Sequence, residues 1–274
     1  MRRTPRGTAR KLAARERHRS PDKMKDTAIR DALVERGTVL FNAPKKLFPF
    51  TREPRADALL NDLTGHPHAF VLACVMDRQI KAERAWLIPY RISEKVGGFS
   101  MRTLSTLSRT DVKRLMGKPD PLHRFVDIMA VHFHSAVQRI ETVYDGNAAK
   151  MWSGEPSSAE VVYRFLEFDG IGPKIATMAA NILARKFKIP LADYFSIDIS
   201  ADVHIRRVFA RLGLCPEDAS VEQVIYRARA LNPEFPGMID LPCWEIGRNW
   251  CKSRRPECAG CYMKDLCPSS AEKR

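Results

Sequence analysis

The chain has 274 residues, of which 45% are hydrophobic, so it is long enough to bury the core of one large domain or two ordinary ones. This composition excludes a mostly disordered protein. The longest apolar stretch, residues 69–76, is far shorter than the about 20 residues that cross a bilayer. No apolar run follows the charged N-terminus, so we expect neither a membrane span nor a secretory signal.

Basic residues exceed acidic ones, 46 against 32, which gives a formal net charge of +14. Such an excess favours a polyanionic partner, namely DNA, RNA or an anionic membrane surface. Residues 1–25 alone contain ten Lys and Arg and two acids, interrupted by Pro5, Gly7 and Pro21. We expect this segment to be a disordered basic arm that follows phosphates, unless Met24 is the true start of the chain.

From residue 26 onward, helical periodicity is common, and no segment has a strand pattern that outweighs it. The sequence therefore predicts an all-α fold. Helices are expected over residues 26–37, 56–63, 68–76, 80–92, 108–116, 122–143, 159–168, 174–187, 203–212, 221–231 and 239–250.

Near the C-terminus, Cys251, Cys258, Cys261 and Cys267 follow the spacing C-x6-C-x2-C-x5-C. Four thiols at this density suit two disulfides, a structural zinc ion or a [4Fe–4S] cluster. The missing secretory signal weighs against disulfides. Zinc loops usually use two close pairs, so one close pair with two outlying thiolates favours the cluster, with zinc as the alternative. Cys243 lies on a predicted helix and is expected to pack rather than bind metal.

Residues 168–176, FDGIGPKIA, join two predicted helices through a Gly-x-Gly turn. Gly170 and Gly172 let the backbone approach a phosphate, to which the following helix offers free N–H groups, although an ordinary helical hairpin explains the same pattern. Lys174 lies in the first helical turn, where the helix dipole disfavours an ammonium. A partly deprotonated lysine is a nucleophile that forms Schiff bases.

The hairpin 170–176, the segment 201–208 (ADVHIRRV) and Gly247-Arg248 ahead of the cysteine loop together resemble the helix–hairpin–helix DNA glycosylase superfamily, specifically its iron–sulfur branch of endonuclease III. The resemblance runs from about residue 70 to residue 267. It implies a six-helix barrel domain with the hairpin, which we place at 68–186. It also implies an iron–sulfur cluster domain, which we assign to 26–67 and 187–274.

The resemblance implies that Lys174 is the nucleophile of a bifunctional glycosylase/lyase and that Asp202 is the catalytic aspartate, the two meeting in a cleft between the domains. Asp202 would stabilise the positive charge that develops on the sugar, and it would also take a proton from Lys174. By itself, Asp202 is more typical of the N-cap of the helix 203–212, and Asp198 is the rival carboxylate.

Contacts to DNA are also implied. Gln79 matches the glutamine that fills the gap left by the extruded base, while Gly170, Gly172 and His204 would bind the DNA around it. The glutamate of the related adenine glycosylases would fall near Cys74 and is missing. Adenine removal is therefore not expected.

The segment between Lys174 and Asp202 is longer than in the relatives. Asp193 and Tyr194 within it are expected to line the base pocket, with a carboxylate that accepts a hydrogen bond and an aromatic face that stacks. A surface loop packed on the cluster domain is the alternative.

We therefore expect a monomeric, cytoplasmic, nucleoid-associated base-excision repair enzyme that carries a [4Fe–4S] cluster. It would act on double-stranded DNA as a DNA glycosylase and abasic-site lyase, and remove a modified pyrimidine. The alternatives are a monofunctional glycosylase for another modified base and a non-catalytic iron–sulfur DNA-binding protein.

Overall fold

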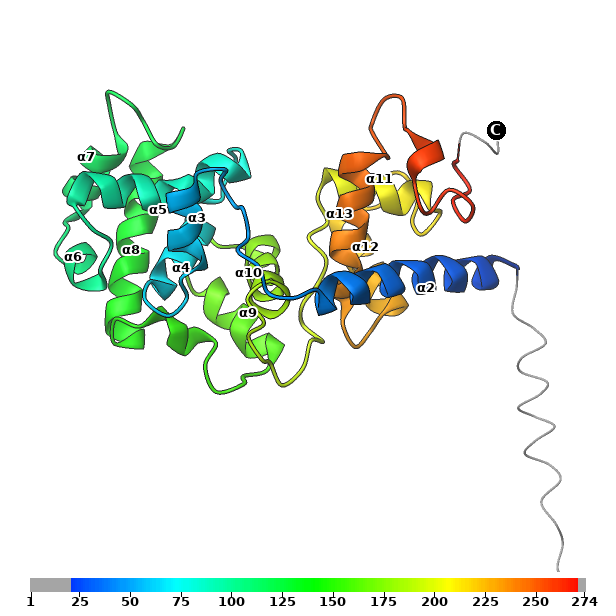
Figure 1. The fold of residues 1–274 in the computed structure, drawn as a ribbon, viewed down its shortest axis with the longest axis horizontal. Coiled ribbons are helices and arrows are strands. Elements are labelled where there is room, and N and C mark those ends of the chain that lie inside the picture. The colour runs from blue at the N-terminus through cyan, green and yellow to red at the C-terminus, as the bar shows by residue number, and fades with distance from the viewer. Residues whose placement is uncertain (1–20, 271–274) are drawn as a thin grey trace, which may run out of the picture. The chain divides into compact units, whose positions relative to one another are not determined.

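The computed structural model describes residues 21–270, and within that range the chain forms helices and no strand (Figure 1). The all-α prediction is confirmed. The α-helices are α2 (Pro21–Asn42), α3 (Pro54–Asn61), α4 (Pro67–Met76), α5 (Ala82–Val96), α6 (Met101–Ser105), α7 (Arg109–Met116), α8 (Val126–Tyr144), α9 (Ser158–Leu166), α10 (Pro173–Arg185), α11 (Val203–Arg211), α12 (Val221–Leu231) and α13 (Asp240–Asn249). Short 3-10 turns are η2 (Ala148–Met151), η3 (Pro236–Ile239) and η4 (Cys258–Gly260).

Every predicted helix has a counterpart, whereas α6 and the 3-10 turns were not predicted. Helix α2 begins at Pro21, so the predicted arm is wrong over residues 21–25, and residues 1–20 lie outside the described part. The prediction treats Pro21 as an interruption of the chain. At the first helical position, however, its missing N–H costs nothing and its φ angle suits a helix.

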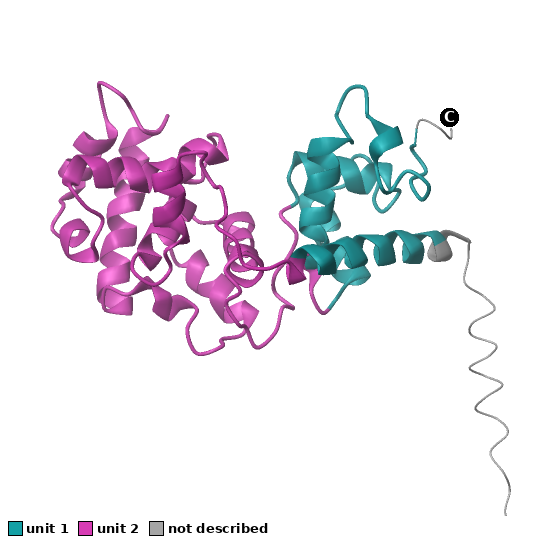
Figure 2. Ribbon diagram, viewed as in Figure 1, with its two compact units in different colours: residues 1–40, 201–233, 238–274 teal, residues 41–200, 234–237 magenta. Residues whose placement is uncertain are grey.

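The chain divides into two compact units (Figure 2). Unit 2 comprises residues 41–200 and 234–237, and α4 forms its centre, packed on α3, α5 and α8. All ten residues of α4 are buried. Phe70 of this helix makes ring contacts with Trp86, Trp152, Phe165 and Phe187. The polar residues that begin at Asp77 therefore follow directly after a helix in the core.

Unit 1 comprises residues 1–40, 201–233 and 238–274, and its described part contains most of α2, helices α11 to α13 and the cysteine loop. Helices α11 and α13 pack so closely that a Cβ atom added at Gly247 would lie 2.8 Å from the Cβ atom of His204. The ion pair between Arg36 and Glu245, with 2.6 Å between Nη2 and Oε1, joins α2 to α13.

The unit boundaries differ from the predicted domain boundaries at both ends. Residues 41–67 belong to the unit with the hairpin, because α3 packs on α4 and α5. Residues 187–200 also belong to it, since the backbone N–H of Ala192 donates to the Pro156 carbonyl at 3.1 Å. That unit 1 acts as an iron–sulfur domain stays a prediction.

Among residues 21–270, no helix combines the length and the apolar character that crossing a bilayer requires.

Candidate active site

A groove of about 700 Å³ in unit 2 lies between the loop that follows α4 and the start of α10. Its lining consists of Asp77, Arg78, Gln79, Ile80, residues 170–175 and Met178. Four of the residues predicted from the sequence, far apart along the chain, therefore come together in one groove. They are Gln79, Gly170, Gly172 and Lys174.

The two glycines of the hairpin are needed for different reasons. Gly170 has a φ of +88°, in the left-handed region that favours glycine, and an added Cβ would lie 3.2 Å from His132 Cδ2 and 3.4 Å from Arg78 Nη1. Gly172 has an ordinary φ of −102°, and its added Cβ would meet nothing within 4 Å. The fold thus requires the glycine at 170, whereas Gly172 leaves its backbone open to a ligand.

Helix α10 begins directly behind this open position. Gly172 is its N-cap residue and makes no side-chain capping bond, and Pro173 occupies the first turn. The first N–H groups of a helix lack partners within the helix, and the positive end of its dipole lies there. The start of α10 is consequently suited to bind an anion such as a phosphate, with the exposed side chain of Lys174 beside it.

Gln79 is exposed and has a φ of +52°, which is unusual for a residue other than glycine. A conformation of this kind costs on the order of 1–3 kcal/mol and persists only where the surroundings impose it. The surroundings here include His123, whose Nε2 lies 3.1 Å from the carbonyl oxygen of Arg78, and the N–H of Arg78, which donates to the Met76 carbonyl at 2.8 Å. The loop presents Gln79 at the groove under strain.

Asp77 also lines the groove, although no role for it was predicted from the sequence. Burial raises the pKa of its carboxyl group, the hydrogen bond from the Trp86 indole lowers it, the charge of Lys174 lowers it further, and Glu83 raises it. The net direction is upward. The only sequence signal was the charged pair Asp77-Arg78 directly after an apolar helix.

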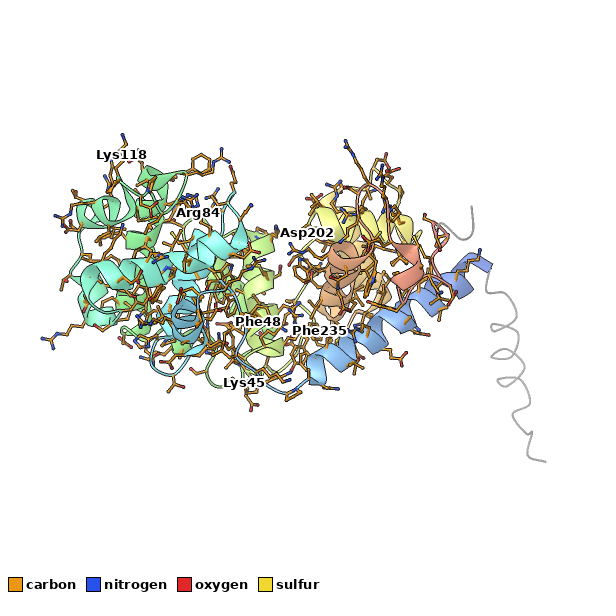
Figure 3. The ribbon with its side chains drawn as sticks, turned by 45° about the horizontal axis from the view of Figure 1, so that its top comes forward. Lys45, Phe48, Arg84, Lys118, Asp202 and Phe235 are labelled. Atoms are coloured by element: carbon orange, nitrogen blue, oxygen red, sulfur yellow. The ribbon has the colours of Figure 1, made fainter. Side chains whose placement is uncertain are left out.

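Asp202 lies in unit 1, at the start of α11 (Figure 3). Its Oδ1 accepts hydrogen bonds from the backbone N–H groups of His204 and Ile205, at 2.8 and 2.9 Å. It is therefore the N-cap of α11, as the helix-cap interpretation predicted. Lys174 belongs to unit 2, and that the two residues meet stays a prediction.

His204 packs where α11 meets α13. Its Nδ1 lies 3.0 Å from Nη2 of Arg207, which also donates to the Gly247 carbonyl at 3.0 Å. The structure explains His204 by packing, and its contact with DNA stays a prediction. Asp198, the rival carboxylate, is 8% exposed and lies in unit 2.

Asp193 and Tyr194 make packing contacts and do not line the groove. The Asp193 carboxylate accepts hydrogen bonds from the hydroxyl group of Ser158 and from the N–H of Phe195. The Tyr194 ring stacks on Phe235, with 4.7 Å between centroids. The segment thus makes contacts within its own unit. Its part in a base pocket and its packing on the cluster domain both stay predictions.

The four cysteines of the loop, all half-buried, line one cavity in unit 1. Arg211 of α11 also lines it and donates a hydrogen bond from Nη1 to Cys251 Sγ at 3.3 Å. Cys243 does not line it and is fully buried on α13. Over residues 21–270, no three His, Cys, Asp or Glu side chains are close enough to hold a single metal ion.

Charge within the loop bears on what it could bind. Burial raises the pKa of the Cys261 thiol, and the thiols of Cys251, Cys267 and Cys258 raise it further. Four thiolates would repel one another unless a bound cation compensated their charge. Four soft sulfur donors around one cavity are a donor set that fits an iron–sulfur cluster.

No protein-family model matches the chain. Endonuclease III of Synechocystis sp. is 29% identical over 117 residues, which cover 38% of this chain and 50% of that protein. The match thus spans about half the length of that relative.

Solved structures with helix–hairpin–helix glycosylase folds are similar over most of the chain. A non-covalent endonuclease III–DNA complex has a TM-score of 0.59 at 18% identity and covers 90% of this chain and 97% of that one. A thermostable thymine-DNA glycosylase has a TM-score of 0.59 at 13% identity, with coverage of 92% and 100%. An 8-oxoguanine glycosylase/lyase of Clostridium acetobutylicum bound to DNA has a TM-score of 0.52 at 16% identity, with coverage of 84% and 71%. The fold resemblance predicted from the hairpin and the cysteine loop is confirmed.

Proposed function

We propose that this chain, whose fold is that of the helix–hairpin–helix DNA glycosylases, is a base-excision DNA glycosylase with an associated abasic-site lyase activity. The observation that carries the proposal is the groove in unit 2, where Gln79, the hairpin glycines and Lys174 lie together. These residues supply a wedge for the base stack, a phosphate-binding helix start and an amine nucleophile. The net charge of +14 suits a polyanionic substrate.

Binding would begin at the phosphates. The open backbone at Gly172 and the free N–H groups of α10 would hold one phosphate of the damaged strand. Extrusion of the damaged base costs a few kcal/mol, and least for a base that already pairs poorly. Gln79, held exposed at the edge of the groove, would occupy the gap that the base leaves.

The chemistry would follow at C1′ of the extruded nucleotide. The Lys174 amine attacks C1′, the glycosidic bond breaks, and the base leaves with the bonding electron pair and takes up a proton. Asp202 would stabilise the positive charge that develops on the sugar. Ring opening yields a Schiff base, and loss of a C2′ proton then expels the 3′ phosphate and breaks the strand.

The substrate we infer is a modified pyrimidine. The lysine is present, and buried Cys74 stands about where adenine glycosylases carry their glutamate. Both features favour the pyrimidine-excising branch of the superfamily. Release of purine lesions alone would contradict the assignment.

A [4Fe–4S] cluster would be held by Cys251, Cys258, Cys261 and Cys267. Bound there, the cluster would supply four Fe–S bonds that fix the loop and neutralise its thiolates. Arg211 would orient Cys251 through its hydrogen bond to Sγ.

The test is a panel of duplexes with single lesions, scored for base release before and after alkali, together with borohydride trapping on abasic DNA. Wild-type protein should form a covalent adduct. Lys174→Arg should abolish trapping and keep DNA binding, because arginine preserves the charge but is not a nucleophile. Lys186 is the matched control, since burial lowers its pKa to about 8 and makes it the rival amine of unit 2.

The possible outcomes separate the candidate functions. Lys186→Arg should trap like wild type, and loss of trapping in this variant instead would move the nucleophile to Lys186. Base release that needs alkali for strand cleavage, without trapping, would identify a monofunctional glycosylase. DNA binding without any base release or strand cleavage would identify a non-catalytic DNA-binding protein.

A further inference from the structure

We propose that Asp77, rather than Asp202, is the base that exchanges protons with Nζ of Lys174 in the lyase reaction. The inference rests on the proposed function and assigns a residue to it. Asp77 and Lys174 line the same groove of the same unit, one at the end of α4 and the other at the start of α10. Asp202 would then act only on the sugar.

The position of Asp77 is unfavourable for a carboxylate. It follows a helix whose ten residues are all buried, and it occupies the C-cap, where the negative end of the helix dipole repels an anion. Desolvation acts in the same direction and raises its pKa. A titratable group whose charged form is destabilised and that lines a groove is a candidate functional residue.

The carboxylate also has a rigid polar neighbour. The indole N–H of Trp86 favours its charged form and lowers its pKa. Trp86 is 4% exposed, and its ring stacks on Phe50 with 4.5 Å between centroids and an interplanar angle of 6°. A donor locked in the core favours one orientation of the group beside it, which a proton acceptor requires.

The charged and titratable groups around Asp77 come from three helices and from the loop that follows α4. Lys174 on α10 stabilises the carboxylate, whereas Glu83 on α5 destabilises it. The thiol of Cys74 lies on α4 itself, and its pKa is raised by burial and then by Asp77. Arg78, the next residue along the chain, lines the same groove. The net upward direction makes Asp77 a stronger base than an exposed aspartate, which brings its proton affinity closer to that of an amine.

The proton transfers balance at an abasic site. The Asp77 carboxylate takes one proton from the Lys174 ammonium and leaves a neutral amine. The Nζ lone pair adds to C1′ of the open-chain aldehyde, and a proton passes from nitrogen to the former carbonyl oxygen. The Asp77 carboxylic acid then returns its proton to that oxygen, which departs as water and leaves the C1′–Nζ Schiff base.

The experiment is the pH profile of borohydride trapping on abasic DNA, measured in single turnover for the full chain and for Asp77→Asn. The amide keeps the volume of the side chain and an oxygen that the Trp86 indole N–H can still favour. We expect the plateau of the trapping rate to fall by about 10²-fold or more, the usual contribution of a general base, while DNA affinity is retained.

The profile also separates a base from a mere electrostatic neighbour. If Asp77 only stabilised the ammonium of Lys174, removing its charge would ease proton loss from Lys174. The midpoint of the profile would then move to lower pH, trapping at neutral pH would rise, and the proposal would be overturned. Glu83→Gln is the matched control, because it removes a nearby charge that does not line the groove, and it should trap at the wild-type plateau.

Thermal unfolding of Asp77→Asn and wild type shows whether the variant still folds. An acid whose folded pKa is raised destabilises the fold above that pKa, and this penalty disappears as the pH falls through it toward the unfolded value of about 3.9. Asp77→Asn should therefore melt above wild type at pH 7. Asp77→Ser is the second variant for the trapping assay.

The two proposals fail differently. Wild-type protein that never traps would overturn the lyase function and this inference with it. Wild-type trapping with an unchanged plateau in Asp77→Asn and Asp77→Ser would overturn only the inference.

Discussion

Asp202 caps α11 through Oδ1, which accepts the backbone N–H groups of His204 and Ile205. The capping role and the proposed catalytic role therefore rest on different properties of one side chain. The cap needs an oxygen acceptor at Oδ1, whereas stabilisation of a sugar cation needs a full negative charge.

Two substitutions separate these roles. Asp202→Asn should leave the free energy of unfolding within about 0.5 kcal/mol of wild type, because asparagine caps helices as well as aspartate does, while Asp202→Ala should lose about 1 kcal/mol. Both should slow base excision by about 10²–10³-fold. Denaturant unfolding and single-turnover excision measure the two effects. Full excision by Asp202→Asn would transfer the catalytic role to Asp198.

At the residue scale, the sequence predicted four members of the groove and missed a fifth. Gln79, Gly170, Gly172 and Lys174 each belong to a motif with local chemistry that is visible along the chain. Asp77 does not, because its significance lies in burial against Trp86 and in a charge carried by another helix. Neither this burial nor the charge on the other helix can be recognised from the residues next to Asp77 in the sequence.

At the scale of elements, the hairpin combines one glycine that the fold requires with one that it does not. Helix α10 lacks a side-chain cap because Gly172 has no side chain. A capping side chain at position 172 would stabilise α10. Gly172 instead leaves the space around its backbone open, which indicates that a ligand approaches the start of α10.

Gly172→Asp and Gly172→Asn test this interpretation as a matched pair. Both side chains are strong N-caps, so both variants should match or exceed the wild-type melting temperature. The aspartate should weaken DNA binding more than the asparagine, because only it repels a phosphate. Equal affinities measured by fluorescence anisotropy would show that no phosphate binds at this helix start.

The cysteine loop has a comparable internal control. Cys258→Ser should lose iron, because it removes one of the four sulfur donors around the cavity, whereas Cys243→Ser should keep it, because Cys243 lies buried on α13 outside that cavity. Iron and acid-labile sulfide analysis with visible absorbance measures both. Wild-type protein with about four irons is expected. One zinc and no iron would contradict the cluster.

At the scale of the whole molecule, charge dominates the expected interaction with DNA. Eight Lys and Arg against one acid lie in residues 1–20, ahead of α2. Each phosphate contact contributes a log–log salt slope of about −0.9. Affinity should therefore fall steeply as salt increases.

Removal of residues 1–20 keeps α2 intact and tests the arm alone. The truncated protein should bind more weakly and show a shallower salt slope, since fewer counterions are released, while single-turnover excision at saturating protein stays unchanged. Binding titrations at several salt concentrations measure the slope. An unchanged slope would exclude the arm as a phosphate contact.

The sequence by itself determined the helices and the motifs between them. Helical periodicity, proline and glycine positions and cysteine spacing act over a few residues, so each can be recognised along the chain. Tertiary packing decided the rest. It joined residues 41–67 to the unit with the hairpin, gave Asp193 and Tyr194 contacts outside the groove, and placed the Asp77 carboxylate in the same groove as Lys174. These features depend on which surfaces of distant segments exclude water from one another, and that is a property of the folded chain alone.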